Sequence, residues 1–374
     1  MSTPSTDPTP ATMPDSDEWG ETLVAPHDSP ALRRRFRRHT GLVPSIVPYV
    51  APHDWLYRPF LFLSSPTLLA IDAELVSAIG FVVARDNACR FCFGTFWSFL
   101  RVAGYSTSAL DRLEGALYLD NRKAGDQKAL RYAVDVSRGR FAEGMAASDL
   151  RAAGYSRIAV REITGAAVLA TLVNRASTML ASPLNVSMEE MTSSWYFDLV
   201  QPVVQSLLTG WQRLAPSEPT LPAEEVGGPL PSWTGRLRET PMGHFVQSIT
   251  WRWLETESAL DLHVKLLILA VVARGLDCTE MEGDVYRLLQ ERCDVGQEEA
   301  RETVDHLRGS AVNARGAVLL DLARASIRYD ARTFQRVTRK HTKGLSRDQT
   351  IDAVASVGLS NALCRLAVLP RFDA

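Results

Sequence analysis

Two of the chain's five cysteines, Cys89 and Cys92, stand three residues apart in the stretch RDNACRFCFGTFW, residues 85–97. On a helix this spacing places both sulfurs on one face, close enough to form a disulfide after modest adjustment. Such a pair suits thiol–disulfide chemistry, in which one thiolate attacks an oxidant and the other resolves the resulting sulfenic acid or mixed disulfide. Two other interpretations stay open at this point: half of a metal site, or two small buried side chains.

A metal site would need further ligands. The remaining three cysteines are isolated along the chain, and none of the seven histidines stands at ligand spacing from another. A structural zinc site usually combines two close cysteine pairs, or one cysteine pair with one histidine pair. We therefore expect no metal and no cofactor, and we favour the redox dithiol over the two buried side chains.

The residues around the pair favour a reactive thiolate. Asn87 is a credible N-cap after a helix that ends near Arg85, which would place both cysteines in the first turn of the next helix. The free amide N–H groups and the dipole at a helix start lower a thiol pKa, and Arg85 and Arg90 add positive charge nearby. The predicted geometry is that of an activated dithiol.

The elements that must position the pair are predicted to be helices. Long apolar runs without turn residues or strict alternation favour buried helices over strands; they span residues 74–85, 160–180 and 262–275. Gly104 and Gly154 stand where a left-handed C-terminal cap is needed, and Ser106 and Ser156 can cap the helices that follow. We predict an all-α fold.

Composition divides the chain into four parts. A length of 374 residues suits two domains. Residues 1–30, rich in Ser, Thr, Pro and Asp, predict a disordered tail, and the proline-rich residues 215–233 predict a linker. These breaks leave two helical segments, residues 31–214 and 234–374.

The two segments resemble each other in the order and spacing of their motifs. The aligned stretches are GFVVARDNAC with LAVVARGLDC (80–89 and 269–278) and GYSRIAVREITGAAVLATLVNRA with GLSRDQTIDAVASVGLSNALCRL (154–176 and 344–366). We predict two tandem helical repeats that arose by internal duplication, although helical Ala, Val and Leu stretches also align by chance. Cys89 pairs with Cys278, but Met281 stands where a second cysteine would be. The second repeat is therefore expected to be redox-silent.

Charge and hydropathy limit the partners and the compartment. The net charge of −2 gives no reason to expect nucleic acid or an acidic membrane as a partner. No stretch reaches the roughly 18 apolar residues of a membrane span, and the N-terminus lacks the basic and apolar regions of a signal peptide. An odd number of cysteines in a long chain does not suit a disulfide scaffold. We predict a cytoplasmic location.

The cysteine stretch and its context resemble a known family. VVARDNACRFCFGTFWSFLRVAGYS, followed by DQKALRYAVDVSRG, LRAAGYSRIAV and a helix ending in VNRASTM, is similar to the core of the alkyl hydroperoxide reductase D family, grouped with the carboxymuconolactone decarboxylases. The resemblance covers about residues 40–182 well and the second segment weakly. It implies an all-α homo-oligomer whose dithiol reduces a hydroperoxide or disulfide substrate. By the same resemblance Cys92 attacks the peroxide, and Cys89 resolves it and exchanges with a lipoyl- or thioredoxin-like thiol reductant.

The chain departs from this family at its proton relay. Where the family has a glutamate before the first cysteine and a histidine after the second, this chain has Ser77 and Phe96. Loss of a positioned base typically costs around 10²–10⁴-fold in rate. Four polar residues near the pair are candidate supports: Glu74, Asp86, Arg90 and Thr95. For the two carboxylates, Glu74 and Asp86, we favour a buried or solvated group without a catalytic role.

Two further features are candidates for substrate contact. Asn174 and Arg175 stand near the end of a long helix, where the family often has the same pair; they would bind an anionic substrate or fix that helix against the cysteine helix, and we favour the second role. Aromatic residues around the cysteines would line an apolar pocket for an organic hydroperoxide or would simply pack the core; they are Phe91, Phe93, Phe96, Trp97 and Phe99.

We expect a thiol-dependent peroxidase or disulfide oxidoreductase that uses Cys89 and Cys92. The alternative is a non-catalytic protein of the same fold, a redox sensor or an oligomeric scaffold, whose pair oxidises without turnover. A lyase like the carboxymuconolactone decarboxylases is disfavoured, because those relatives use acid–base residues rather than two thiols.

Overall fold

The computed structural model describes residues 13–51, 53–117, 124–139, 146–214, 236–256, 258–328 and 330–369. These residues form eighteen α-helices and a short 3₁₀ helix, η1 (Ser16–Glu18). Within the described ranges the only extended pairing is an isolated bridge between Gly309 and Val312. The predicted all-α class is confirmed.

The helices fall on either side of the undescribed residues 215–235. Those before it are α1 (Pro30–Thr40), α2 (Val47–Val50), α3 (Asp54–Ser64), α4 (Ala73–Asp86), α5 (Arg90–Val102), α6 (Thr107–Ala116), α7 (Ala124–Arg138), α8 (Ala147–Ala152), α9 (Arg157–Leu180), α10 (Val186–Ser193) and α11 (Phe197–Leu214). Those after it are α12 (Pro241–Glu255), α13 (Leu262–Gly275), α14 (Thr279–Cys293), α15 (Gln297–His306), α16 (Ala314–Ala325), α17 (Ala331–His341) and α18 (Arg347–Val368).

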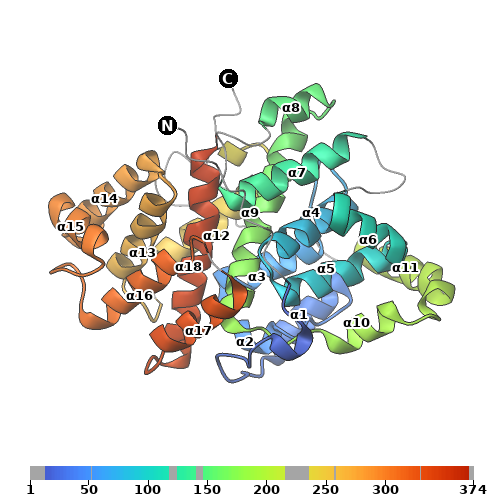
Figure 1. Ribbon diagram of the computed structural model, residues 1–374, viewed down its shortest axis with the longest axis horizontal. Coiled ribbons are helices and arrows are strands. Elements are labelled where there is room, and N and C mark those ends of the chain that lie inside the picture. Colours follow the sequence, from blue (N-terminus) through green and yellow to red (C-terminus); the bar gives the residue numbers. More distant parts are fainter. Residues whose placement is uncertain are drawn as a thin grey trace, which may run out of the picture.

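Two long helices, α9 and α18, pack against each other in the middle of the molecule (Figure 1). Gly358 permits their close approach, because a Cβ there would lie 3.1 Å from the Leu172 side chain and 3.3 Å from its carbonyl oxygen. Both helices are long and apolar enough to cross a membrane, which corrects the expectation that no stretch of the chain would be, but their most apolar windows are 100% and 94% buried inside the protein. They are the core helices of this fold, and the cytoplasmic location stays a prediction.

Helix boundaries follow the local signals in the sequence. The Ser106 hydroxyl accepts the N–H of Ala109 at the start of α6, and the Ser156 hydroxyl accepts the N–H of Ala159 at the start of α9. Gly104 and Gly154 have φ values of 104° and 93°, the left-handed conformation predicted for them. The structure confirms these predicted caps. The sequence could predict them because each depends only on neighbours within three or four residues.

The two halves of the chain repeat one unusual contact. Glu162 on α9 accepts hydrogen bonds of 2.7–3.1 Å from the backbone N–H groups of residues 69–71, just before α4. Asp352 on α18 accepts hydrogen bonds of 2.6 and 3.2 Å from those of residues 259–260, just before α13. The sequence alignment pairs Glu162 with Asp352, so a buried carboxylate ties the long helix to the same preceding loop in both halves.

The termini and the linker only partly fall within the described residues. Residues 1–12 of the predicted tail and the predicted linker 215–233 lie outside them. The remainder of the predicted tail is not free of the body: the Trp19 indole N–H donates to Ser182 O at 2.8 Å, and the Leu23 N–H donates to Leu180 O at 2.8 Å. The predicted tail contains apolar side chains among its prolines and serines. Those of Trp19 and Leu23 pack against the core, which explains these contacts.

Candidate functional site

The cysteine pair lies where α4 gives way to α5. Asn87 is the C-cap of α4 rather than the N-cap of α5, so this sequence-based prediction is wrong. The Asn87 amide donates to Val83 O at 2.9 Å and to the Ser137 hydroxyl at 2.8 Å, a partner fifty residues away that no local pattern shows. Ala88 then takes a left-handed φ of 49°, and the chain reverses into α5.

This reversal makes Cys89 the N-cap of α5 and Cys92 the third residue of that helix. The Cys89 N–H donates to Ala84 O at 2.9 Å, which closes the turn. The second half builds the same turn: Asp277 has a φ of 55°, and the Cys278 N–H donates to Ala273 O at 2.9 Å. Both thiols of the first half therefore lie at a helix start, as the spacing predicts.

The environment of the two thiols is asymmetric. Burial acts to raise the pKa of Cys89, but the Cys92 thiol, the N–H groups of Cys92 and Phe91 and the Thr178 hydroxyl outweigh it, so that this pKa is lowered. Burial and the neighbouring Cys89 raise the pKa of Cys92, whose thiol donates to the Ser177 hydroxyl at 3.6 Å. Of the two thiols, Cys89 is therefore the one that ionises more readily.

Sequence reasoning missed the two hydroxyl groups that complete this site. Ser177 and Thr178 are fully buried on α9, some 85 residues along the chain from Cys92. The Thr178 hydroxyl has no oxygen or nitrogen partner among the described residues and lies beside Cys89. The only available signal was helical spacing, since both follow Asn174 by three or four residues and so share its face.

Asn174 is an unusual buried residue. Its side chain is 0% exposed, and neither amide atom has a hydrogen-bond partner within the described chain. More than about 90% of buried polar groups in proteins are paired, so an unpaired amide on the helix face that meets the thiols is a candidate substrate contact. This observation favours the substrate role for Asn174.

Arg175 has a structural role instead. Its guanidinium donates to the Asn87 side-chain oxygen at 2.9 Å and to Ile327 O at 3.3 Å. It therefore ties the long helix α9 to the turn that carries Cys89, in line with the structural role favoured from the sequence, and it also reaches the second half of the chain.

Each of the four candidate supports contacts residues other than the two cysteines. Asp86 accepts from Arg138 at 2.6 and 2.9 Å, and Arg90 pairs with Glu189. Their contacts with the thiols stay a prediction.

The other two candidates lie on the cavity side of the site. Glu74 accepts from the Tyr105 hydroxyl at 3.2 Å, and Thr95 accepts from the Asn185 amide at 2.8 Å. Neither of these two hydrogen bonds involves a sulfur.

The two positions that the resemblance aligns with a proton relay, Ser77 and Phe96, hold no acid–base side chain. The Ser77 hydroxyl donates to Ala73 O of its own helix at 2.9 Å. Phe96 is 4% exposed and fills the space over Gly80, where a Cβ would lie 2.4 Å from the ring. The Phe96 ring occupies the space that a side chain at residue 80 would fill, which explains why an apolar residue suits position 96.

Gly80→Ala is expected to lower the free energy of unfolding by about 1–3 kcal/mol, because the new methyl group must displace the Phe96 ring. The measurement is urea unfolding followed by circular dichroism. Gly283→Ala is the control, because a Cβ at this exposed position of α14 meets nothing within 4 Å. It should stabilise by up to about 1 kcal/mol through helix propensity. Equal effects of the two changes would refute the packing argument.

A cavity of about 660 Å³ lies beside the dithiol helix. Glu74 and Ser77 of α4, Thr95 and Phe99 of α5 and Met191 of α10 contribute to its lining. Glu74 is the only charged residue among the described lining residues, so the cavity suits an uncharged, largely apolar molecule. Neither cysteine lines it, although Thr95 and Phe99 continue the helix face that begins at Cys92.

Both sulfurs are screened from solvent in the single chain. Cys89 is 0% and Cys92 2% exposed, and both are free thiols. A reaction with any oxidant therefore requires the oxidant to enter the protein or the site to open. An enzymatic mechanism must overcome the burial of both sulfurs, so a measurement of repeated turnover is the informative experiment.

The second half keeps a thiol at the same turn without a second cysteine. Met281 takes the place of Cys92, and its sulfur lies 3.2 Å from the Cys364 sulfur. Burial raises the pKa of both Cys278 and Cys364. No group of three or more His, Cys, Asp or Glu side chains in the described part of the chain could hold a metal ion.

Comparisons with family models, curated proteins and solved structures find no match to this chain. The resemblance to the alkyl hydroperoxide reductase D family therefore depends on the sequence motifs alone.

Proposed function

We propose that Cys89 and Cys92 form a redox-active dithiol, and that the protein is a thiol-dependent peroxidase or disulfide oxidoreductase. The observation that carries this proposal is the asymmetry of the pair. One thiol belongs to the N-cap residue of α5 and has a lowered pKa, while its neighbour has a raised pKa and donates to a buried hydroxyl. A dithiol cycle needs one readily ionised attacking sulfur and a second sulfur close enough to resolve the product.

The chemistry assigns the steps differently from the resemblance. The Cys89 thiolate attacks the outer oxygen of a hydroperoxide; the O–O bond breaks, Cys89 becomes a sulfenic acid, and the alkoxide takes a proton to leave as an alcohol. Cys92 then attacks the Cys89 sulfur, the disulfide forms, and water leaves. A lipoyl- or thioredoxin-like dithiol protein reduces the disulfide and completes the cycle. The lowered pKa and the helix-cap position of Cys89 support this order over attack by Cys92.

The surroundings favour an organic over an inorganic peroxide. The unpaired Asn174 amide can donate to or accept from a peroxide oxygen, which the neighbouring Ser177 and Thr178 hydroxyls would also contact. The cavity along α5 can accept an apolar tail and offers no positive charge to a carboxylate.

A redox sensor is the second candidate, and the burial of both sulfurs favours it specifically. In a sensor the pair oxidises once, when the site opens, and the new disulfide changes the α4–α5 turn. The all-α architecture and the thiol positions are the same in both proposals, so only turnover separates them.

We also propose that the chain is an internal duplication whose second half acts as a scaffold. The matched carboxylates Glu162 and Asp352 and the matched turns at Ala88 and Asp277 support it, because neither contact is required of helical proteins in general. With a methionine in place of the second cysteine, the second half cannot close the local disulfide.

Turnover with cumene hydroperoxide and dihydrolipoamide tests the function. We expect the wild-type chain to consume many equivalents of hydroperoxide, and we expect Cys89→Ser and Cys92→Ser each to abolish turnover. Cys92→Ser should still form a sulfenic acid on Cys89, detected by mass spectrometry after dimedone trapping. Cys293→Ser, which removes a half-buried thiol outside the pair, is the control and should retain full activity.

Other outcomes have distinct meanings. Consumption of a single equivalent with formation of the Cys89–Cys92 disulfide would identify the sensor. If Cys89→Ser forms a sulfenic acid on Cys92 while Cys92→Ser forms none on Cys89, Cys92 is the attacking thiol, as the resemblance implies. Failure of peroxide to oxidise either thiol would exclude both candidates.

A further inference from the structure

Helix α11 presents an apolar stripe to solvent. Its residues, which we call the α11 stripe, are Tyr196, Leu199, Val200, Val203 and Leu207, with exposed fractions of 45, 74, 42, 62 and 69%. At 100° per residue these five positions fall within an arc of about 100°. Trp195, two residues before the helix begins at Phe197, is 83% exposed and extends the same surface.

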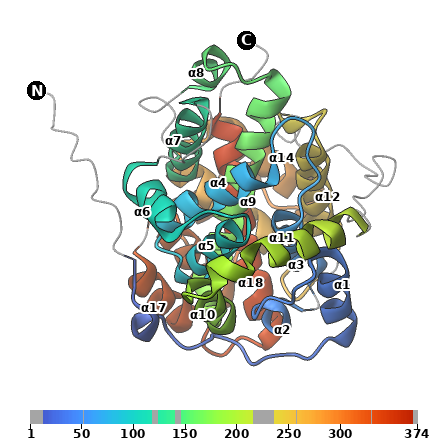
Figure 2. The same cartoon turned by 90° about the vertical axis from the view of Figure 1, so that its right-hand side faces the viewer.

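The opposite face of α11 is fixed on the body. Phe197 is fully buried there, and Arg101 donates to Asp198 at 2.6 Å. The side chains of Gln201 and Gln205 donate to Val102 O and Ala103 O at the end of α5, at 2.9 and 3.2 Å. The stripe therefore belongs to a docked helix that keeps its apolar side outward, and Figure 2 shows α11 lying across this face of the molecule.

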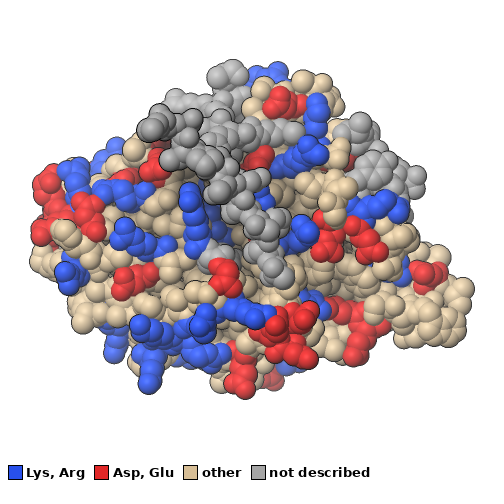
Figure 3. Space-filling view, in the orientation of Figure 1, with Lys and Arg blue, Asp and Glu red and all other residues tan. Residues whose placement is uncertain are grey.

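The stripe is too large to be ordinary surface. Eight of the ten large hydrophobic residues that are exposed in the described chain lie between Val186 and Leu207, so the apolar exposure is concentrated at one place. With Trp195 these residues expose on the order of 700 Å², above the roughly 300–600 Å² of a typical monomer's largest patch and near the roughly 800 Å² per partner in a stable complex. The right-hand end of the molecule in Figure 3, where α11 lies, is accordingly mostly tan.

We propose that a second copy of this chain covers the stripe, in a two-fold dimer that packs α11 against its counterpart. A two-fold interface brings the same residues together, which is favourable here because the stripe carries no charge. Its apolar residues recur at intervals of three and four, the spacing that lets two helices interlock ridges and grooves. The area of the stripe is close to what such a dimer needs.

A lipid surface is a poorer occupant. Helices that lie in a membrane interface are rich in Lys and Arg beside their apolar face. Within the α11 sequence the only charged residues are Asp198 and Arg213, and Asp198 is paired with Arg101. The charge pattern therefore fits a protein surface.

Sedimentation velocity on the full-length chain tests this proposal, independently of thiol chemistry. We expect a dimer at about 10 μM for the wild type, and Val203→Glu should weaken dimerisation at least about 100-fold, because two carboxylates would be buried together. Leu69→Glu is the matched control: Leu69 is 62% exposed, like Val203, but lies before α4, and the dimer should be unchanged. Circular dichroism verifies that both variants are folded.

A cross-link tests the two-fold arrangement. Val203 lies near the middle of the stripe, so Val203→Cys should form a disulfide-linked dimer under mild oxidation, whereas Leu69→Cys should not. A wild-type chain that sediments as a monomer, or a dimer that Val203→Glu leaves intact, would overturn the proposal. Binding of a monomeric chain to phosphatidylcholine vesicles would overturn it too, by naming lipid as the occupant.

Discussion

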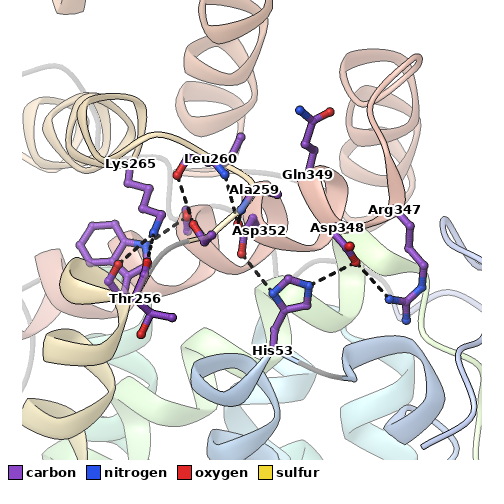
Figure 4. Close-up of polar contacts among 12 residues, drawn as sticks. His53, Thr256, Ala259, Leu260, Lys265, Arg347, Asp348, Gln349 and Asp352 are labelled. Atoms are coloured by element: carbon purple, nitrogen blue, oxygen red, sulfur yellow. Dashed lines mark hydrogen bonds and ion pairs between the residues drawn. The ribbon is translucent and has the colours of Figure 1, made fainter.

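Asp352→Ala is expected to lower the free energy of unfolding by about 3–5 kcal/mol, the usual cost of removing one member of a buried charged network. The Asp352 carboxylate is 0% exposed and accepts from the backbone N–H groups of residues 259–260. Its other oxygen lies 3.2 Å from His53 Nδ1 (Figure 4). Alanine would leave both amides and the nearby buried Lys265 ammonium without this carboxylate, so α18, α13 and α3 would lose a shared anchor.

The matched control is Asp348→Ala, one turn earlier on α18. The Asp348 carboxylate is 63% exposed, lies 3.7 Å from the other nitrogen of His53 and 3.5 Å from Arg347, and contributes at most about 1 kcal/mol as a surface pair. Urea unfolding of both variants gives the comparison. Equal losses for the two variants would show that the buried hydrogen bonds contribute little.

The difference in free energy of unfolding between wild type and Asp352→Ala should change with pH in a definite direction. Burial raises the pKa of Asp352, but His53, Ser258 and Lys265 together lower it below the ordinary value. A lowered folded pKa stabilises the protein above the unfolded pKa of about 3.9, and this contribution is lost as the pH falls through the folded value. The stability gap between wild type and Asp352→Ala should therefore be constant above about pH 5 and should narrow below pH 4.

Asn174→Leu is expected to do the opposite and raise the free energy of unfolding by about 1–3 kcal/mol. Leucine has a similar shape, and the buried Asn174 amide makes no hydrogen bond within the described chain that the substitution would remove. If the amide contacts the peroxide, the same variant should oxidise its Cys89–Cys92 pair at least about tenfold more slowly. A gain in stability with a loss of rate is the signature of a functional polar group.

Asn361→Leu is the control for this substitution. Asn361 is also 0% exposed, but its amide donates to the Ser326 hydroxyl at 2.7 Å and its oxygen accepts from Arg365 at 2.9 Å. Leucine there would remove one hydrogen bond from each of two buried groups, the Ser326 hydroxyl and the Arg365 guanidinium, and should destabilise by about 1–3 kcal/mol. If both leucine variants destabilise alike, Asn174 is a structural residue and its proposed contact with the peroxide is wrong.

The sequence by itself determined the all-α class, the caps at Ser106 and Ser156 and the pair of thiols at a helix start. Each is a local property. Apolar spacing selects the helix, a serine accepts an amide three residues away, and a left-handed glycine ends a helix wherever it stands. Local rules of this kind need no knowledge of the rest of the chain.

The tertiary structure decided which residues surround the thiols and which of the two thiols has the lower pKa. The Asn87 side chain does not cap α5; its oxygen accepts from Arg175 and its amide donates to Ser137. The hydroxyls of Ser177 and Thr178 contact the cysteines from a helix far along the chain. Packing also buried both sulfurs and placed the Phe96 ring over Gly80. A thiol pKa depends on burial and on neighbours brought together by folding, and spacing along one helix contains no information on either.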